Sequence, residues 1–196
     1  AFVLNDARAE VLFVGKEFFP VLEDLLPGLK DVRKVIALDA PHTGWEEYEA
    51  WRDAQPETDP QIPVDLSDVA VQMYTSGTTG HPKGAQLTHE NFLTLLPAAT
   101  NEWGARWTID DVNLVCMPLF HIAGSGWGVL GLYAGARSVV VRDIIPTEIL
   151  KVIPEHRITR AIFVPAVLLF LVQTPGAQET DFSSLNLIAY GASPIP

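Results

Sequence analysis

Short apolar runs alternate with longer amphipathic stretches along most of this chain, and this alternation narrows its fold more than any other feature. Runs typical of buried strands occupy residues 10–15, 33–39, 69–74, 112–117, 138–142, 161–164 and 185–190. Helical patterns lie between them, at residues 17–30, 44–54, from residue 90 onward, in a glycine-rich stretch that ends near residue 136, and at residues 146–155 and 165–173. Strands that alternate with helices are typical of parallel βαβ units. We therefore predict an α/β fold in layers, with mostly parallel sheets flanked by helices.

The composition excludes several classes of protein. Apolar residues make up 48% of the 196 residues and charged residues 19%. This composition is too apolar for a disordered chain. A net charge of -11 argues against a protein that binds nucleic acid through its phosphates, because such proteins present a basic face. Cys116 is the sole cysteine, so an intramolecular disulfide and a cysteine-based zinc site are excluded, and a reducing, cytoplasmic compartment is expected.

One uncharged stretch, residues 112–136, is long enough to cross a membrane. Asn113, Pro118 and His121 interrupt it, and its first residues form a strand-like run that ends at the proline. We interpret the stretch as a buried strand, a turn and a buried helix whose small residues pack tightly on a sheet. No transmembrane segment is expected.

A glycine-rich segment carries most of the functional information: residues 74–84 read YTSGTTGHPKG. Glycine lets backbone N–H groups approach a phosphate closely, hydroxyl groups add hydrogen-bond donors, and a lysine ammonium can follow a departing polyanion. The segment follows a predicted strand, which is where α/β folds commonly hold phosphate. It is not a Walker loop, because Pro82 stands where that motif needs glycine, and its glycine spacing does not fit the dinucleotide motif G-x-G-x-x-G.

This segment resembles the phosphate-binding signature of the adenylate-forming enzymes, the superfamily of acyl-CoA synthetases, amino-acid adenylation domains and beetle luciferases. Further segments resemble the family's later motifs in the family's order: GAQLTHEN at residues 84–91, MPLFH at 117–121, RAIFVP at 160–165 and YGASP at 190–194. Within the superfamily the chain is most similar to acyl-CoA synthetases of the fatty-acyl or aryl type. The resemblance implies a fold that is part of the large N-terminal, AMP-binding domain of such an enzyme.

The resemblance implies a reaction in two halves. A carboxylate attacks the α-phosphate of ATP, which gives an acyl-adenylate and pyrophosphate, and the thiol of CoA then attacks the acyl-adenylate. The implied small molecules are a fatty or aromatic carboxylic acid, ATP with Mg²⁺, and CoA. Both halves need preorganised groups that stabilise charge on oxygen. An amino-acid adenylation domain and a non-catalytic nucleotide-binding truncation are the alternatives that stay open.

The resemblance also implies roles for particular residues. Lys83 and His121 are the implied catalytic residues: Lys83 contacts the pyrophosphate, and His121 orients the substrate carboxylate and helps to separate the two half-reactions. The implied phosphate-binding residues are Thr75, Ser76, Gly77, Thr78, Thr79, Gly80 and Lys83. The implied adenine-side loop is Gly191, Ala192, Ser193 and Pro194. Ala123 and Trp127 either line the acyl pocket or belong to ordinary packing, and no residue of the chain is expected to bind a metal.

Several parts of the family pattern do not occur in this sequence. They are the motif Y-G-x-T-E, whose glutamate helps to hold Mg²⁺, the ribose-binding aspartate, the hinge, and the C-terminal domain with its catalytic lysine. We therefore expect residues 1–196 to be an incomplete N-terminal AMP-binding domain, cut from a longer protein and inactive alone. Within it we expect an acidic α/β portion and linker over residues 1–68, and a phosphate-loop and acyl-pocket portion over residues 69–196. The identity of the acid and the oligomeric state stay open.

Overall fold

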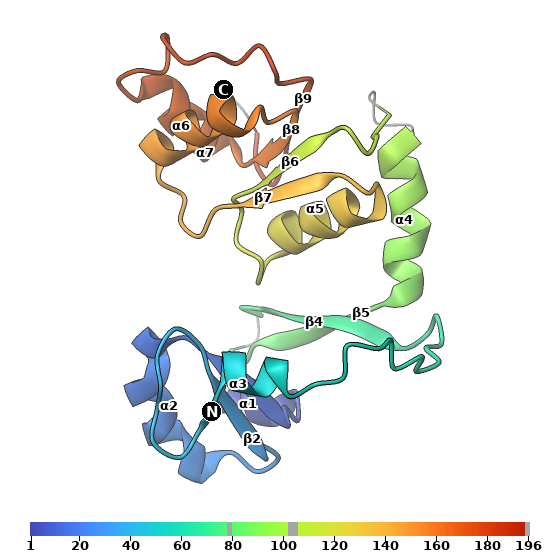
Figure 1. Ribbon diagram of the computed structural model, residues 1–196, viewed down its shortest axis with the longest axis vertical. Coiled ribbons are helices and arrows are strands. Elements are labelled where there is room, and N and C mark those ends of the chain that lie inside the picture. Colours follow the sequence, from blue (N-terminus) through green and yellow to red (C-terminus); the bar gives the residue numbers. More distant parts are fainter. Residues whose placement is uncertain (78–79, 102–105, 195–196) are drawn as a thin grey trace. The chain divides into compact units, whose positions relative to one another are not determined.

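The computed structural model describes residues 1–77, 80–101 and 106–194 (Figure 1). The chain divides into two compact units, residues 1–87 and residues 88–196. Each unit has its own parallel sheet and its own apolar core. The division predicted at residue 68 separates an acidic portion and its linker from the portion with the phosphate loop and the acyl pocket. It stays a prediction.

The first unit is built on a parallel sheet of three strands in the order β1-β2-β3. The strands are β1 (Val11–Val14), β2 (Lys34–Ala37) and β3 (Glu46–Glu47). Leu22 from helix α2 (Phe19–Leu25) packs with Val14 and Val35 of the two longer strands and forms the buried core of this unit. The first two strands predicted from the sequence are confirmed.

The long helix predicted at residues 17–30 is wrong, because the stretch forms three short elements. Helix α2 lies between two 3₁₀ turns, η1 (Lys16–Phe18) and η2 (Leu26–Gly28). A proline stands in the first turn of α2 and another in the first turn of η2. Proline is tolerated there because its missing N–H would have no partner, but it does not let a preceding helix continue.

The helix predicted at residues 44–54 forms only over α3 (Tyr48–Asp53). Glu46 and Glu47 are extended instead and pair with Ile36 and Ala37 of β2. A short helix that the sequence pattern does not reveal, α1 (Phe2–Asp6), precedes β1. Pairing with a neighbouring strand therefore overrides the local helical pattern of the two glutamates.

The glycine-rich segment joins two strands that pair with each other, β4 (Val69–Thr75) and β5 (Lys83–Thr88). Parallel strands need a crossover connection of about a dozen residues or more, so this short connection makes the pair an antiparallel hairpin. The hairpin is an exception to the parallel pairing of the other strands. It holds the two ends of the glycine-rich loop on neighbouring strands of one sheet.

The second unit is built on a parallel sheet of four strands in the order β7-β6-β8-β9. The strands are β6 (Val112–Val115), β7 (Arg137–Val140), β8 (Arg160–Phe163) and β9 (Leu187–Tyr190). The helices are α4 (His89–Asn101), α5 (Ile122–Tyr133), α6 (Pro146–His156) and α7 (Pro165–Gln173). Parallel strands flanked by helices confirm the predicted fold class.

Successive residues of β6 divide the core of the second unit into two layers. Leu114 packs with residues of α6 and α7, such as Ile149. Val115 belongs to the other layer, together with Trp127 of α5 and Leu96 of α4. Because neighbouring strand residues point to opposite faces, helices cover both faces of this sheet, as is usual for parallel sheets.

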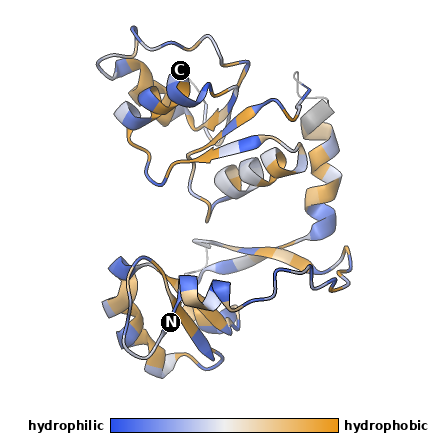
Figure 2. Ribbon diagram, viewed as in Figure 1, coloured by the Kyte–Doolittle hydropathy of each residue, from blue (hydrophilic) through white to orange (hydrophobic). Residues whose placement is uncertain are grey.

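Helix α5 lies very close to the sheet and to the turn that follows β6, because two of its glycines face them. A Cβ atom on Gly124 would overlap two carbonyl oxygens of the preceding turn, and one on Gly131 would overlap the side chain of Asn113. The many glycines of α5 make it the palest helix of the unit in Figure 2. The predicted strand, turn and tightly packed helix are thus confirmed, and no helix in the described part of the chain is long and apolar enough to cross a membrane.

Candidate functional site

The loop between β4 and β5 contains the residues expected to bind phosphate. The structure describes Thr75, Ser76, Gly77, Gly80 and Lys83, whereas Thr78 and Thr79 lie outside the described residues. The backbone is left-handed at Gly77 (φ +61°) and Gly80 (φ +97°), a conformation that other residues rarely adopt. A Cβ atom on Gly77 would also overlap the carbonyl oxygen of His81. The path of this loop therefore depends on glycine.

The polar side chains that the structure describes in this loop are open to solvent. Thr75, Ser76 and Lys83 are all exposed, so their hydroxyl groups and the ammonium group are accessible to a ligand. Hydroxyl donors, one ammonium group and glycines with a left-handed backbone suit a chain of phosphates. The binding roles of these residues stay predictions, but the loop has the donors and the accessibility that they require.

His121 is fixed by the helix that follows it. It is the N-cap residue of α5, and its Nδ1 atom accepts a hydrogen bond of 3.2 Å from the backbone N–H of Ala123. In a neutral ring, an accepting Nδ1 leaves the proton on Nε2. The exposed ring therefore has an N–H donor free to meet a carboxylate oxygen.

A cavity of 340 Å³ in the second unit brings several predicted residues together. His121, Ala123, Gly191 and Ala192 line it, so the histidine expected beside the acid shares one space with part of the loop expected beside adenine. Its other lining residues are Ile122, Ile162, Phe163 and Val164. The cavity lies beyond the carboxyl ends of β6, β8 and β9, where open parallel sheets bind ligands.

The chain turns sharply where β9 ends. Ala192 adopts a left-handed conformation (φ +73°), which is uncommon for a residue other than glycine. Ser193 and Pro194 follow it, are exposed, and do not line the cavity that contains Ala192. The structure therefore brings the first half of the predicted adenine-side loop to His121, and the second half lies outside that cavity.

A smaller apolar cavity of 150 Å³ adjoins the first and shares Ile122, Ala123 and Ile162 with it. Trp127 lines this second cavity as well, and the remaining lining residues are Phe92, Leu95, Leu96, Ala99, Gly126 and Leu130. Trp127 is only 5% exposed and packs edge to face against Trp107 at 5.1 Å. Trp127 is therefore a core residue that also forms part of an apolar cavity wall, and its role in an acyl pocket stays a prediction.

The sequence did not predict a buried ion pair in the second unit. Arg160 donates a hydrogen bond to Asp111 at 2.8 Å, and both side chains are at most 6% exposed. Burial raises the pKa of Asp111, but hydrogen bonds from Arg160 and Thr159 outweigh this effect and hold that pKa below its ordinary value. The arginine inside the apolar run 160–165 was the available signal, because a buried charge needs a partner.

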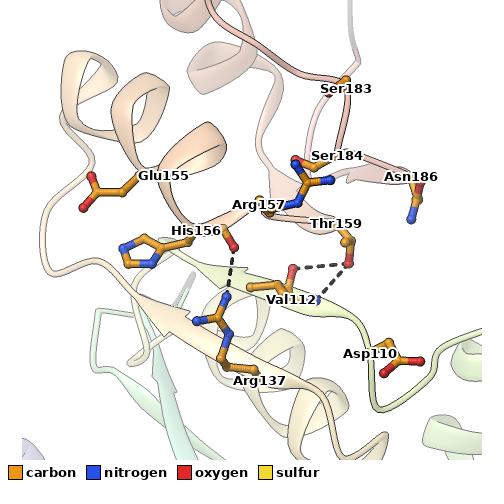
Figure 3. A pocket seen from close by; sticks show the side chains of 10 residues that line it. All are labelled: Asp110, Val112, Arg137, Glu155, His156, Arg157, Thr159, Ser183, Ser184 and Asn186. Atoms are coloured by element: carbon orange, nitrogen blue, oxygen red, sulfur yellow. Dashed lines mark hydrogen bonds between the residues drawn. The ribbon is translucent and has the colours of Figure 1, made fainter.

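A larger cavity of 540 Å³ lies at the opposite, amino end of the same strands (Figure 3). It is lined by Asp110, Val112, Arg137, Glu155, His156, Arg157, Thr159, Ser183, Ser184 and Asn186. Figure 3 shows Arg137 directed at the backbone carbonyl of His156, to which it donates a hydrogen bond of 2.9 Å. The carboxylates of Asp110 and Glu155 offset the charges of its arginines, and no predicted site residue lines it. The cavity at the carboxyl ends is therefore the candidate site of this unit.

The sequence is similar to known ligases. It is 35% identical over 198 aligned residues to the fatty acid–[acyl-carrier-protein] ligase ScoC of Streptomyces coeruleorubidus, which covers 98% of this chain and 36% of the relative. It is 34% identical to the indoleacetate–CoA ligase of Aromatoleum aromaticum, which covers 99% of this chain and 38% of the relative. This chain thus spans little more than a third of the length of these curated relatives.

Solved structures with a similar fold, and the family that the sequence matches, agree with these sequence similarities. The anthranilate CoA ligase AuaEII in complex with anthranoyl-AMP matches with a TM-score of 0.90 and 25% identity, over 100% of this chain and 38% of that chain. The N-terminal domain of FACL13 from Mycobacterium tuberculosis matches with a TM-score of 0.83 and 27% identity, over 100% of this chain and 48% of that chain. Residues 1–196 match the family described as "AMP-binding enzyme". This match confirms the resemblance to adenylate-forming enzymes. The chain is a member of the AMP-binding enzyme family.

Proposed function

We propose that this chain is part of an ATP-dependent acid–thiol ligase, which activates a carboxylic acid as an acyl-adenylate and passes the acyl group to CoA. The observation that carries this proposal is the single cavity lined by His121, Gly191 and Ala192, in a member of the AMP-binding enzymes. By their names, similar proteins act on a fatty acid, indoleacetate or anthranilate. A fatty or aromatic acid is therefore the proposed substrate.

The glycine-rich loop is the proposed site of the β- and γ-phosphates of ATP. The residues proposed to wrap them are Thr75, Ser76, Gly77, Thr78, Thr79, Gly80 and Lys83. The pyrophosphate gains negative charge as its bond to the α-phosphate breaks, so donors aimed at its oxygens favour the transition state. The exposed ammonium of Lys83 sits on a flexible stem and can stay with the leaving pyrophosphate.

His121 is proposed to orient the acid rather than to remove a proton from it. A carboxylic acid is already ionised near neutral pH, so the attack on the α-phosphate needs no general base. The Nε2–H donor left by the hydrogen bond from Ala123 to Nδ1 can hold one carboxylate oxygen and leave the other free to attack. The adjoining apolar cavity, with Ala123 and Trp127 in its wall, is proposed to take the apolar part of the acid.

Gly191, Ala192, Ser193 and Pro194 are proposed to contact adenine, and CoA is the proposed acceptor. Among the described residues, no three histidine, cysteine, aspartate or glutamate side chains gather as a metal site. Mg²⁺ bound to ATP would neutralise charge on the phosphate oxygens. We place the parent enzyme in the cytoplasm, since the cysteine of this chain is free and buried. The proposed substrates place it in the metabolism of fatty or aromatic acids.

Pyrophosphate release by the full-length protein tests the proposal directly. The assay compares fatty acids of increasing length, aromatic acids, acetate and amino acids, each with ATP, and then measures thioester formation with CoA and with an acyl carrier protein. Lys83→Ala should lower kcat by on the order of 100-fold, as the loss of a transition-state donor does. The isolated chain of residues 1–196 should show no turnover.

Two substitutions at His121 separate its role in the site from its role in the helix. Asparagine is a good N-cap residue, so His121→Asn should keep the stability of α5 while it disturbs the position of the acid. His121→Ala should lose both, and His156→Ala, a histidine of the cavity at the other end of the strands, serves as the matched control. Activity with amino acids alone would favour an adenylation domain, and ATP binding without pyrophosphate release from any acid would favour a non-catalytic module.

A further inference from the structure

Helix α1 contacts the chain on both sides of the glycine-rich loop. The ring of Phe2 stacks on the ring of His81, with centroids 5.1 Å apart and planes 25° apart. The carboxylate of Asp6 accepts a hydrogen bond of 2.6 Å from the hydroxyl of Tyr74. Phe2 and Asp6 are four residues apart and therefore lie on one face of the helix. Since Tyr74 precedes the loop residues 75–80 and His81 follows them, this one face touches both ends of the loop.

The helix is itself held to the rest of the first unit. The side-chain amide of Asn5 donates a hydrogen bond of 2.9 Å to the carbonyl of Gly28, and its oxygen accepts one of 3.0 Å from the backbone N–H of Lys30. A helix as short as α1 is not stable in water on its own, so such contacts are what keep it in place. The turn that precedes β2 is thereby linked, through α1, to the glycine-rich loop.

The contact at Tyr74 continues into the hairpin. Gln72 donates a hydrogen bond of 2.8 Å to the Tyr74 hydroxyl, and Gln86 of β5 donates one of 3.4 Å to Gln72. The Tyr74 hydroxyl donates to a carboxylate, and this hydrogen bond raises the pKa of Tyr74. Asp6 is therefore joined to both strands of the hairpin.

We propose that Phe2 and Asp6 form a clamp, the loop clamp, that fixes the ends of the glycine-rich loop and so prepares it for the phosphates of ATP. A loop rich in glycine loses much conformational entropy when it orders around a ligand. A loop that is ordered beforehand loses less on binding and so binds more tightly. Phe2 and Asp6 are positioning residues, which act through His81 and Tyr74. The link to ATP rests on the proposed function, whereas the restraint of the loop does not.

Limited proteolysis of the folded full-length protein measures the restraint without any substrate. Trypsin cleaves after Lys83, an exposed residue at the end of the loop. Phe2→Ala should raise the rate of this cleavage by about 2- to 10-fold, because the loop opens more often when the aromatic pair is lost. Phe2→Tyr keeps the stacked ring and should cleave at the wild-type rate. Phe18→Ala, which removes an exposed aromatic ring of the same unit, should also leave the rate unchanged.

A double-mutant cycle shows whether Phe2 acts through its stacking partner. If it does, His81→Ala and the combined Phe2→Ala/His81→Ala protein should be cleaved at the same rate. Equal rates for wild type and Phe2→Ala, or effects of the two substitutions that multiply, would overturn the clamp. Circular dichroism checks that each variant is folded. If Phe2→Ala does not fold, Asp6→Asn tests the other end of the loop, with Asp24→Asn as the control.

The kinetics of pyrophosphate release then test the link to ATP. Phe2→Ala should raise the KM for ATP by about 2- to 10-fold and leave kcat and the KM for the acid unchanged, since only loop ordering is affected. An unchanged KM for ATP together with faster cleavage would reject the role in phosphate binding. Wild-type protein without ATP-dependent activity would reject the proposed function, and the cleavage rates would still decide whether the clamp exists.

Discussion

Removal of the Asp111 carboxylate should destabilise the second unit far more than removal of an exposed carboxylate. Asp111 accepts hydrogen bonds from Arg160, from the Thr159 hydroxyl and from the Thr108 backbone N–H, at 2.8, 2.7 and 2.8 Å. In Asp111→Ala these donors lose their acceptor, and the Arg160 guanidinium stays buried without a counter-charge. Breaking a buried pair in this way costs about 3–5 kcal/mol, and we expect the free energy of unfolding to fall by that amount.

The measurement has to report on the second unit alone, because two compact units can unfold separately. Hydrogen exchange of the strand amides of β6 and β8 under native conditions gives the free energy of opening of this sheet. Asp110→Ala, which removes an exposed carboxylate of the same unit, is the control and should change little. The double variant Asp111→Ala/Arg160→Met should recover most of the loss, because no unpaired charge is then buried.

The ion pair also predicts a dependence on pH. Burial opposes the charge of Asp111, but its hydrogen-bond donors hold its pKa below the ordinary value, so the unfolded state binds its proton more readily. The stabilisation is therefore complete above about pH 4 and is lost as the pH falls through the lower pKa of the folded state. The wild type should lose its advantage over Asp111→Ala across this range. A loss below about 1 kcal/mol at pH 7, or a difference that is the same at pH 7 and pH 3, would refute the reasoning.

Glycine and cysteine positions give three further tests. In thermal unfolding, Gly131→Ala should lower the free energy of unfolding by about 1–3 kcal/mol, because its Cβ atom overlaps a buried side-chain amide. Gly128→Ala is the control and should change little, because its Cβ atom meets a valine at 3.8 Å. Gly77→Ala should weaken ATP binding in titration calorimetry, since its left-handed backbone and the carbonyl beside it exclude a side chain; Gly28→Ala, in open space, should not. Burial raises the pKa of Cys116 to about 11, so a thiol reagent at pH 8 should modify the native protein far more slowly than the urea-unfolded one, and equal rates would contradict this burial.

The parts of the fold that sequence alone predicted are those with local causes. The run at residues 161–164 is apolar and ends at Pro165, and the structure has a strand there followed by a helix that begins at that proline. The extended conformation of Glu46 and Glu47 could not be predicted in this way, because it depends on pairing with a strand that is distant in the sequence. Arg160 and Asp111 are likewise far apart in the chain, and no local pattern reveals that they meet.

The candidate site divides in the same way. The residues of the glycine-rich loop are contiguous, so their motif and their position after a strand could be recognised directly. That His121 and Gly191 share a cavity depends on which strands are neighbours, since β8 separates β6 from β9 in the sheet. Strand order is a property of the folded sheet, and several orders fit the same alternation of strands and helices. The sequence could therefore name these residues through a family resemblance, but only the structure could join them.

The apolar cavity of the second unit follows from the side chains that α5 lacks. Gly131 faces the strands and Gly124 faces the turn that follows β6, and their missing Cβ atoms bring the helix close to both. Ala123 and Gly126 face the cavity, and their small size leaves it open beside the residues of α4. A Cβ atom on Gly126 would meet only the end of the Ile122 side chain, at 3.4 Å, so no backbone contact excludes a larger residue there. The two sets of small residues thus have separate physical effects: one sets the packing of the helix, and the other sets the volume that an apolar ligand can occupy.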